Sequence, residues 1–390
     1  MKLDTLLRGS LEALVIASVT FPVAMLNKVL FAVVLVIATV VAVRRSRRLA
    51  FETIAPLIVA FVFLYGATIG VGGDIDHTLA RQLLFSVALL FLIYPIRWAS
   101  TDFDGIIRRA GMWLTFFSFV YWAALGLSPF SASALTLFEW MTDASLAAAG
   151  TRDFLGFPIF MVHLGTSPFL LVSFALVLVR DRDRPPRVPL AALTMFVAIL
   201  MSTSRALILL AIVLAGVIVP ERYPPRVRVA LTVIAAALGA GGLAWLADTT
   251  AIFSATDVSN AIKIGHAESF LSTRSWEGLL LGDGLAAMHF TTGLGLRVPQ
   301  TEITLFDLVR YVGLLFAPLV FLALVCPVLD PRRYIASATG RLAVLVFTAY
   351  LFLAMTNPVL FNSAGLTVVL WYWSRILQPP AGAANRNVFA

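Results

Sequence analysis

Residues 188–220 read VPLAALTMFVAILMSTSRALILLAIVLAGVIVP, an apolar stretch with the polar residues Ser202-Thr203-Ser204-Arg205 near its centre. As a single helix it would be about 50 Å long, well beyond a hydrocarbon core of about 30 Å. Divided at the polar residues, it gives two helices of about 24 Å, each slightly short of that core. The stretch therefore predicts a helical hairpin in a membrane, with its turn at residues 202–205 drawn below the outer surface.

The rest of the chain has the same apolar character. Hydrophobic residues make up 60% of the sequence and charged residues 13%, and the mean hydropathy is +0.93. Apolar runs of about 16 to 24 residues alternate with short basic or Gly/Pro-containing breaks, which is typical of membrane-spanning helices. We predict twelve spans, at residues 10–26, 28–43, 52–70, 83–98, 111–127, 157–179, 188–203, 205–220, 229–247, 304–327, 341–356 and 363–378. The predicted fold is an all-α polytopic integral membrane protein, with residues 1–390 in a single transmembrane domain.

The distribution of Lys and Arg predicts the orientation of the chain, because cytoplasmic loops are enriched in both. With these spans, 21 of the 29 Lys and Arg residues fall on one side of the membrane and eight on the other. Both termini are therefore predicted to be cytoplasmic. Two long loops, residues 128–156 and 248–303, face outward, and residues 379–390 are predicted to be a disordered cytoplasmic tail. Arg clusters at the span ends account for the formal charge of +8, which argues against nucleic acid as a partner.

Arginines on the outward side oppose this bias and need another explanation. Arg205 at membrane depth costs about 2.5 to 3.5 kcal/mol, so we expect it to meet an anion or line a wet cavity, unless it snorkels to lipid headgroups. Guanidinium suits phosphate because its planar fork donates two parallel hydrogen bonds. Arg274 is the second candidate, with a solvated loop arginine as its alternative. Arg81, Arg152 and Arg297 are weaker candidates for substrate binding, and each is alternatively an exposed charge.

The second outward loop ends on Glu302, directly before an apolar span. A partly desolvated carboxylate there is a candidate general base, whereas a carboxylate that complements the helix macrodipole is the structural alternative. Asp307 and Arg310 are three residues apart on one helix and are predicted to form an intramembrane ion pair. His266 and His289 are candidate substrate contacts. No histidine has metal-ligand spacing, and we predict no metal or other cofactor.

Together these elements resemble a known family. The shared elements are Ser204-Arg205 at an outward hairpin, Arg274 followed by Trp276, the turn Gly282-Asp283-Gly284, and Glu302 about eleven residues before Gly313. Their order and sidedness are similar to those of Wzy-type O-antigen polymerases and O-antigen ligases. The resemblance covers the topology of the whole chain and the motifs of its second half. Ligases present a His-Asn or His-Ser pair where this chain has Thr301-Glu302, and this difference favours a polymerase. The alternative is that His289 or His266 is a displaced substitute for the ligase histidine.

The resemblance implies glycosyl transfer at the periplasmic face of a bacterial inner membrane, without a metal or a nucleotide sugar. The donor would be a glycan on undecaprenyl diphosphate, and the acceptor a second lipid-linked repeat unit. Arg205 and Arg274 would bind the diphosphate, Glu302 would accept the proton of the attacking hydroxyl, and Trp276 would stack on a sugar ring. A chain-length regulator and a flippase of the same pathway would be protein partners.

Other functions stay open at this stage. An O-antigen ligase would transfer the glycan to lipid A-core instead of a repeat unit. A flippase for lipid-linked oligosaccharides, or another transporter, also has about twelve spans, but the sequence lacks an internal repeat and has a long outward loop. A non-catalytic membrane scaffold would keep its charged residues on exposed or lipid-facing surfaces.

Overall fold

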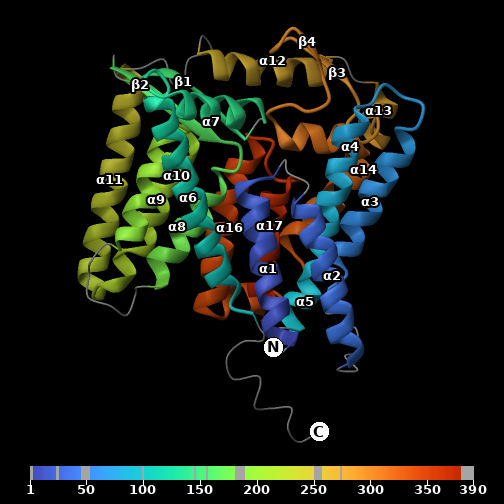
Figure 1. Ribbon diagram of the computed structural model, residues 1–390, viewed down its shortest axis with the longest axis horizontal. Coiled ribbons are helices and arrows are strands. Elements are labelled where there is room, and N and C mark those ends of the chain that lie inside the picture. The colour runs from blue at the N-terminus through green and yellow to red at the C-terminus, as the bar shows by residue number, and fades with distance from the viewer. Residues whose placement is uncertain are drawn as a thin grey trace, which may run out of the picture. The chain divides into compact units, whose positions relative to one another are not determined.

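The computed structural model describes residues 3–22, 26–44, 53–98, 101–144, 146–154, 157–180, 189–249, 257–272 and 275–378 (Figure 1). The tail predicted to be disordered, residues 379–390, lies outside these residues. The chain is mostly helical and divides into two compact units. Unit 1 comprises Met1, Arg8–Val34 and Asp102–Phe253, and unit 2 comprises Lys2–Leu7, Leu35–Thr101 and Ser254–Ala390.

Unit 1 consists of helices and one antiparallel hairpin. Its elements are α6 (Phe103–Leu127), α7 (Ala132–Asp143), β1 (Ala147–Phe154), β2 (Phe157–Leu164), α8 (Phe169–Arg180), α9 (Leu190–Met201), α10 (Arg205–Ile218), the 3-10 turn η2 (Pro220–Arg222) and α11 (Pro225–Thr249). Two N-terminal helices, α1 (Leu3–Thr20) and α2 (Leu26–Arg44), contribute residues to both units. Within unit 1, α8 packs against α6, where the Ser173 hydroxyl donates to the Ile107 carbonyl oxygen at 3.0 Å.

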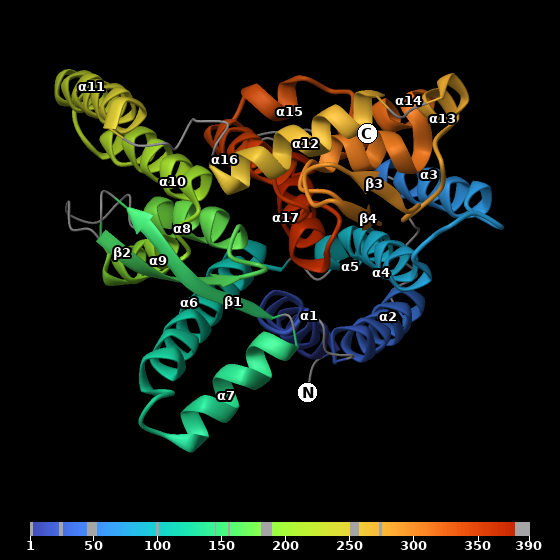
Figure 2. The same cartoon turned by 90° about the horizontal axis from the view of Figure 1, so that it is seen from above.

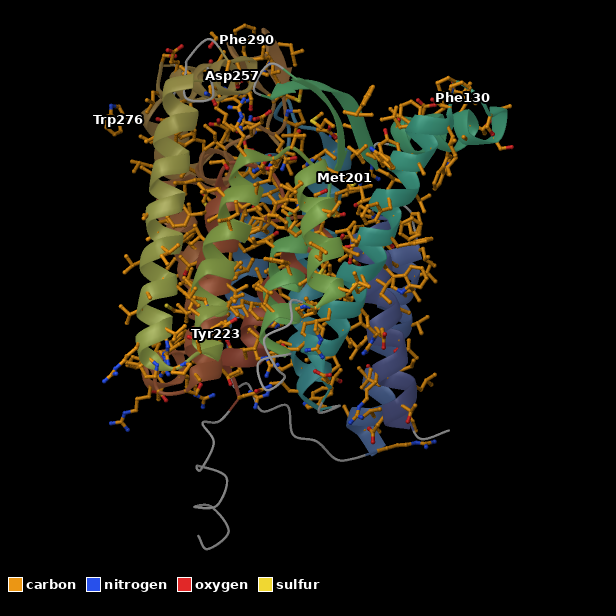
Figure 3. All side chains as sticks on the ribbon, turned by 90° about the vertical axis from the view of Figure 1, so that its left-hand side faces the viewer. Phe130, Met201, Tyr223, Asp257, Trp276 and Phe290 are labelled. Carbon is orange, nitrogen blue, oxygen red and sulfur yellow. The ribbon has the colours of Figure 1, made fainter. Side chains whose placement is uncertain are left out.

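The predicted helical hairpin is confirmed. α9 ends at Met201, α10 begins at Arg205, and Thr203 in the turn adopts a φ of 48°. The Ser204 amide donates to the Ser202 hydroxyl at 3.3 Å, which supports the turn. Figure 3 shows Met201 at this turn and Tyr223 beyond the far end of α10. Helices of 12 and 14 residues are about 18 and 21 Å long, so neither crosses a core of about 30 Å by itself.

The span predicted at residues 157–179 is wrong in its first part. Residues 157–164 form β2, which pairs with β1 from Ala147↔Leu164 to Phe154↔Phe157, and α8 begins only at Phe169. A short apolar run fits a strand as well as a helix, and this one contains Pro and β-branched residues that disfavour a helix. The predicted loop at residues 128–156 likewise contains α7 and β1.

Unit 2 consists of helices and a second small hairpin. Its elements are α3 (Ala55–Ile69), α4 (His77–Ala88), η1 (Leu89–Leu92), α5 (Ile93–Trp98), α12 (Val258–Ser272), α13 (Trp276–Leu281), β3 (His289–Thr291), β4 (Leu296–Val298), α14 (Thr304–Val325), α15 (Arg332–Ile335), α16 (Ala338–Met355) and α17 (Ser363–Ile376). The predicted outward loop at residues 248–303 therefore contains α12, α13, β3 and β4. Figures 1 and 2 show α12 beside the β3–β4 hairpin at one end of this unit.

The core of unit 2 lies around α17. Every residue of this helix except Arg375 is buried, so it is surrounded by other elements, and its Trp371 and Trp373 are no more than 1% exposed. Trp373 donates from Nε1 to the Leu324 carbonyl oxygen at 3.0 Å, and the Tyr372 hydroxyl donates to that of Val325 at 2.7 Å. These bonds attach α17 to the C-terminal end of α14.

α14 is kinked, although the sequence predicts an unbroken span at residues 304–327. Gly313 inside it has φ 76° and ψ 165°, a conformation that favours glycine. A Cβ atom at this position would lie 2.1 Å from the Leu280 carbonyl oxygen, so only glycine lets α13 approach α14 so closely. The Asp283 amide also donates to the Arg310 carbonyl oxygen at 2.7 Å. The glycine-containing turn after α13 thus packs directly onto the kink.

Apolar helices of membrane-spanning length occur in the described part of the chain. Five are long and apolar enough to cross a membrane: α2, the continuous stretch His77–Trp98, α6, α14 and α16. Each of the other seven predicted spans contains a helix as well, and their membrane crossing stays a prediction. These helices are compatible with a multi-pass membrane protein.

Candidate functional site

The candidate site lies in unit 2, where α12 and the β3–β4 hairpin meet the start of α14. One face of α12 is buried against its neighbours and carries His266, Ser269 and Phe270, which follow the helical spacing of three and four residues. Phe270 stacks on Phe306 of α14 with ring centroids 4.5 Å apart and planes 4° apart. Polar groups on α12 are thereby held beside the first turn of a membrane-spanning helix.

The hairpin approaches α12 with its backbone. A Cβ atom on Gly265 would lie 2.3 Å from the amide nitrogen of Gly293, so this approach requires glycine. The Thr292 amide donates to the Ser269 hydroxyl at 2.8 Å, and the Thr292 hydroxyl donates to the Gly265 carbonyl oxygen at 3.0 Å. These contacts place the neighbouring Thr291 opposite His266.

The hydrogen bonds of Thr291 determine which nitrogen of His266 carries the proton. Nδ1 of His266 lies 2.6 Å from the Thr291 hydroxyl oxygen, which also accepts the Gly293 amide proton at 3.2 Å. We assign the Thr291 hydroxyl as the donor to Nδ1, because the same oxygen already accepts the Gly293 amide proton. With this assignment the neutral imidazole carries its proton on Nε2.

His266 is only 1% exposed, and its Nε2 has no hydrogen-bond partner in the part of the chain that the structure describes. Burial lowers the pKa of this imidazole below 6.5, and the positive charges of Arg310 and Lys263 lower it further, while Glu302 opposes them. His266 is therefore neutral at pH 7. It presents a buried N–H donor beside a carboxylate and two cations.

Glu302 forms an ion pair with Lys263, with 3.1 Å between Oε2 and Nζ. The Lys263 ammonium also donates to the Ser259 hydroxyl at 3.2 Å. The side chain of Glu302 is 39% exposed and that of Lys263 30%, so water and other molecules reach the pair. Lys263, His266 and Glu302 form what we call the Lys263–His266–Glu302 cluster. It combines an accessible carboxylate, an ammonium and a fixed neutral donor.

The predicted ion pair between Asp307 and Arg310 is confirmed. Nη2 of Arg310 lies 2.8 Å from Oδ1 of Asp307, and the two side chains are 1% and 4% exposed. Asp307 also accepts from the Thr301 amide at 2.8 Å and from the Thr301 hydroxyl at 3.1 Å. Arg310 donates to the Val298 carbonyl oxygen at 3.2 Å. The buried pair therefore holds the segment before α14 and positions Glu302.

The hairpin separates two other predicted site residues. Successive side chains of a strand alternate between its faces, so His289 shares the face of Thr291, toward α12. Arg297 pairs in register with Phe290 and lies on the opposite face. There its Nη2 is 2.9 Å from Oδ2 of Asp74, and both side chains are more than half exposed. Arg297 is thus a rim charge outside the cluster.

The structure does not bring the remaining predicted site residues into the cluster. Arg81 is exposed on α4 and donates from Nε to the His77 carbonyl oxygen at 3.0 Å. Trp276 begins α13 with 78% of its surface exposed, and its ring is directed away from the unit (Figure 3). Arg205, the first residue of α10, belongs to unit 1 and is partly exposed. The side chain of Arg152 and all of Arg274 lie outside the described residues.

Sequence reasoning missed Lys263 and Thr291 as members of the site. The spacing of three between Lys263 and His266 places both on one side of a helix, and this signal is present in the sequence. The contacts to Glu302 and Thr291 connect residues 39 and 25 positions apart, which no local pattern reveals. Among the described residues, no group of three or more His, Cys, Asp or Glu side chains is arranged to hold a metal ion.

The depressed pKa of His266 predicts a pH dependence of this region. Between pH 6.5 and the lower pKa of the folded protein, the unfolded chain binds more protons, so stability falls as the pH falls. We expect the amides of α12 and of the β3–β4 hairpin to exchange hydrogen faster at about pH 5.5 than at about pH 7.5, after correction for intrinsic rates. His266→Gln should remove this difference, whereas His77→Gln, at an exposed position, should keep it. An unchanged difference in His266→Gln would show that another group titrates.

Neither models of protein families nor curated proteins give a match to this chain. A functional assignment therefore rests on the chemistry of its own residues.

Proposed function

We propose that this protein is a membrane glycosyltransferase that polymerises undecaprenyl-diphosphate-linked oligosaccharide repeat units at the periplasmic face of a bacterial inner membrane. The observation that carries the proposal is the half-exposed ion pair of Glu302, at the start of α14, with Lys263, on the helix α12 that also carries the buried His266. An accessible carboxylate beside an ammonium group suits acid–base chemistry on a hydroxyl group. The resemblance of the sequence motifs to Wzy-type polymerases supports the same assignment.

In the proposed reaction, a hydroxyl oxygen of the acceptor sugar attacks the anomeric carbon of the donor glycan. The bond between that carbon and the diphosphate oxygen breaks, and undecaprenyl diphosphate leaves with the electron pair. Glu302 accepts the proton of the attacking hydroxyl. Lys263 holds the carboxylate before the substrate enters. His266 is buried, Nε2 included, so it has a positioning role, bonded through Nδ1 to Thr291, and not that of a base.

The leaving diphosphate requires positive charge where its own charge develops. We assign this role to Arg205 and Arg274, because a guanidinium group binds phosphate oxygens in pairs. Trp276 presents an exposed aromatic face on which a sugar ring can stack. Arg81, Arg152, Arg297 and His289 stay candidates for contacts with the glycan. Both termini are proposed to be cytoplasmic, which follows from the unequal distribution of Lys and Arg.

Removing the positive charge of Arg205 or of Arg274 tests their assignment to the diphosphate. Arg205→Ala and Arg274→Ala are each expected to lower polymer formation in cells by about 10²-fold or more, because a group that stabilises developing charge contributes that much. Protein levels in the membrane should stay normal. Arg226→Ala, at an exposed position on α11, removes the same charge elsewhere and should have no effect. Polymer of wild-type amount and length from Arg205→Ala would contradict the role of Arg205.

A further inference from the structure

A second polar feature of unit 2 lies far from the Lys263–His266–Glu302 cluster. It is a cavity of about 290 Å³ lined by Ile96, Arg97, Thr101, Ser374 and Gln378. Ser374 follows Trp373, which is bonded to the C-terminal end of α14, whereas Glu302 precedes its N-terminal end. The two features therefore lie at opposite ends of the 22-residue α14.

The lining of this cavity is rich in hydrogen-bond donors. The Thr101 hydroxyl oxygen is buried and has no partner among the residues that the structure describes. The Gln378 side-chain oxygen accepts from Arg375 at 3.3 Å, so its amide nitrogen remains to donate. Ser374 already donates its hydroxyl proton to the Trp371 carbonyl oxygen at 2.7 Å, so it can only accept from a ligand. No carboxylate is among the described residues that line the cavity. The donors of Thr101 and Gln378 therefore favour a ligand that accepts hydrogen bonds.

The charge around the cavity is positive. Arg97 is one of its walls and is repelled by the charge of Arg333. Arg333 donates to the Leu377 carbonyl oxygen at 3.1 Å, and its pair with the half-exposed Asp330 is loose, at 3.8 Å. Arginines near helix C-termini compensate the helix macrodipole, and this explains the position of Arg97 in the last turn of α5. The macrodipole does not explain why a second guanidinium group, that of Arg333, lies near Arg97 at this cavity.

We propose that this cavity binds a phosphate group, and that its source is the headgroup of an anionic membrane lipid. Arg97 lies one residue before the end of the membrane-spanning stretch His77–Trp98, at the level where lipid headgroups reside. Basic pockets between membrane helices bind such headgroups, because phosphate accepts hydrogen bonds and carries the complementary charge. A soluble phosphate has the same chemistry but lacks the anchoring of the acyl chains.

Native mass spectrometry of the full-length protein with phosphatidylglycerol or phosphatidylcholine tests this proposal. We expect wild-type protein to retain phosphatidylglycerol in preference to phosphatidylcholine. Arg97→Gln should weaken phosphatidylglycerol binding by about fivefold, the usual contribution of one basic residue near an anionic surface. The matched control, Arg226→Gln on α11, changes the same charge at an exposed position and should bind like wild type.

Two further measurements distinguish a lipid site from a site for a soluble anion and from no phosphate site. Gln378→Leu removes a donor at an exposed position, so it should fold normally and weaken phosphatidylglycerol binding in the same direction. Inorganic phosphate at the same concentration should not displace the lipid. Displacement by inorganic phosphate would assign the cavity to a soluble anion and overturn the lipid assignment. Equal phosphatidylglycerol binding by wild type, Arg97→Gln and Gln378→Leu would overturn the phosphate site itself.

Discussion

Glu302→Gln is expected to lower the rate of polymer formation by about 10²- to 10⁴-fold, the usual contribution of a general base. The amide keeps the size of the side chain and can still accept a hydrogen bond from Lys263, but it cannot take the proton of the attacking hydroxyl. The rate is to be measured as elongation of lipid-linked repeat units by purified protein. The apparent affinity for these units should change much less than the rate, because the substitution impairs the proton transfer and not the binding of the substrate.

Glu268→Gln is the matched control, since Glu268 is an exposed carboxylate on α12, the helix that carries Lys263 and His266. It should elongate chains at the wild-type rate. His266→Gln separates the two roles considered for the histidine, because Gln retains a donor close to the Nε2 position and cannot act as a base. We expect it to retain most of the activity. Wild-type elongation by Glu302→Gln, or complete loss in a folded His266→Gln, would reverse the roles assigned to these residues.

Asp307→Ala is expected to lower the free energy of unfolding by about 3 to 5 kcal/mol, because it leaves the buried guanidinium of Arg310 without its counter-ion. The substitution also removes both hydrogen bonds from Thr301, so the segment that carries Glu302 should loosen. Unfolding by sodium dodecyl sulfate in mixed micelles measures the loss. Hydrogen exchange of residues 298–303 should rise in the same variant.

Asp330→Ala provides the comparison at the surface. Asp330 pairs with Arg333 at 3.8 Å, and its side chain is 51% exposed, so its loss should cost about 0 to 1 kcal/mol. The double variant Asp307→Ala/Arg310→Leu should recover part of the stability, because it removes the stranded charge as well. If Asp307→Ala and Asp330→Ala destabilise the protein equally, the Asp307–Arg310 pair does not hold this region together.

The sequence predicts most of the helices, because an apolar run of about 16 to 24 residues has few other structures open to it in a membrane. The turn before Arg205 follows from comparing the length of an apolar stretch with the thickness of a bilayer. The pairing of Asp307 with Arg310 follows from helical spacing. Both rest on local relations along the chain, and the structure confirms both.

Where the prediction is wrong or incomplete, packing between distant segments decides the structure. The strand β2 forms because β1 pairs with it, and the mostly apolar run at residues 157–164 does not by itself reveal a pairing partner. The kink at Gly313 depends on the approach of α13, which comes from the preceding loop. Lys263 reaches Glu302, and Thr291 bonds to His266, only because α12 and the hairpin fold onto the start of α14. These contacts bring the polar residues of the loop at 248–303 together in a candidate site.

Elongation by the purified protein in liposomes, supplied with undecaprenyl-diphosphate-linked repeat units and no nucleotide sugar, tests the proposed function most directly. We predict a ladder of longer lipid-linked chains that is lost in Glu302→Gln and kept in Glu268→Gln. Transfer only to lipid A-core would identify a ligase. Movement of the lipid-linked unit across the bilayer without elongation would identify a flippase, and either result would contradict polymerisation.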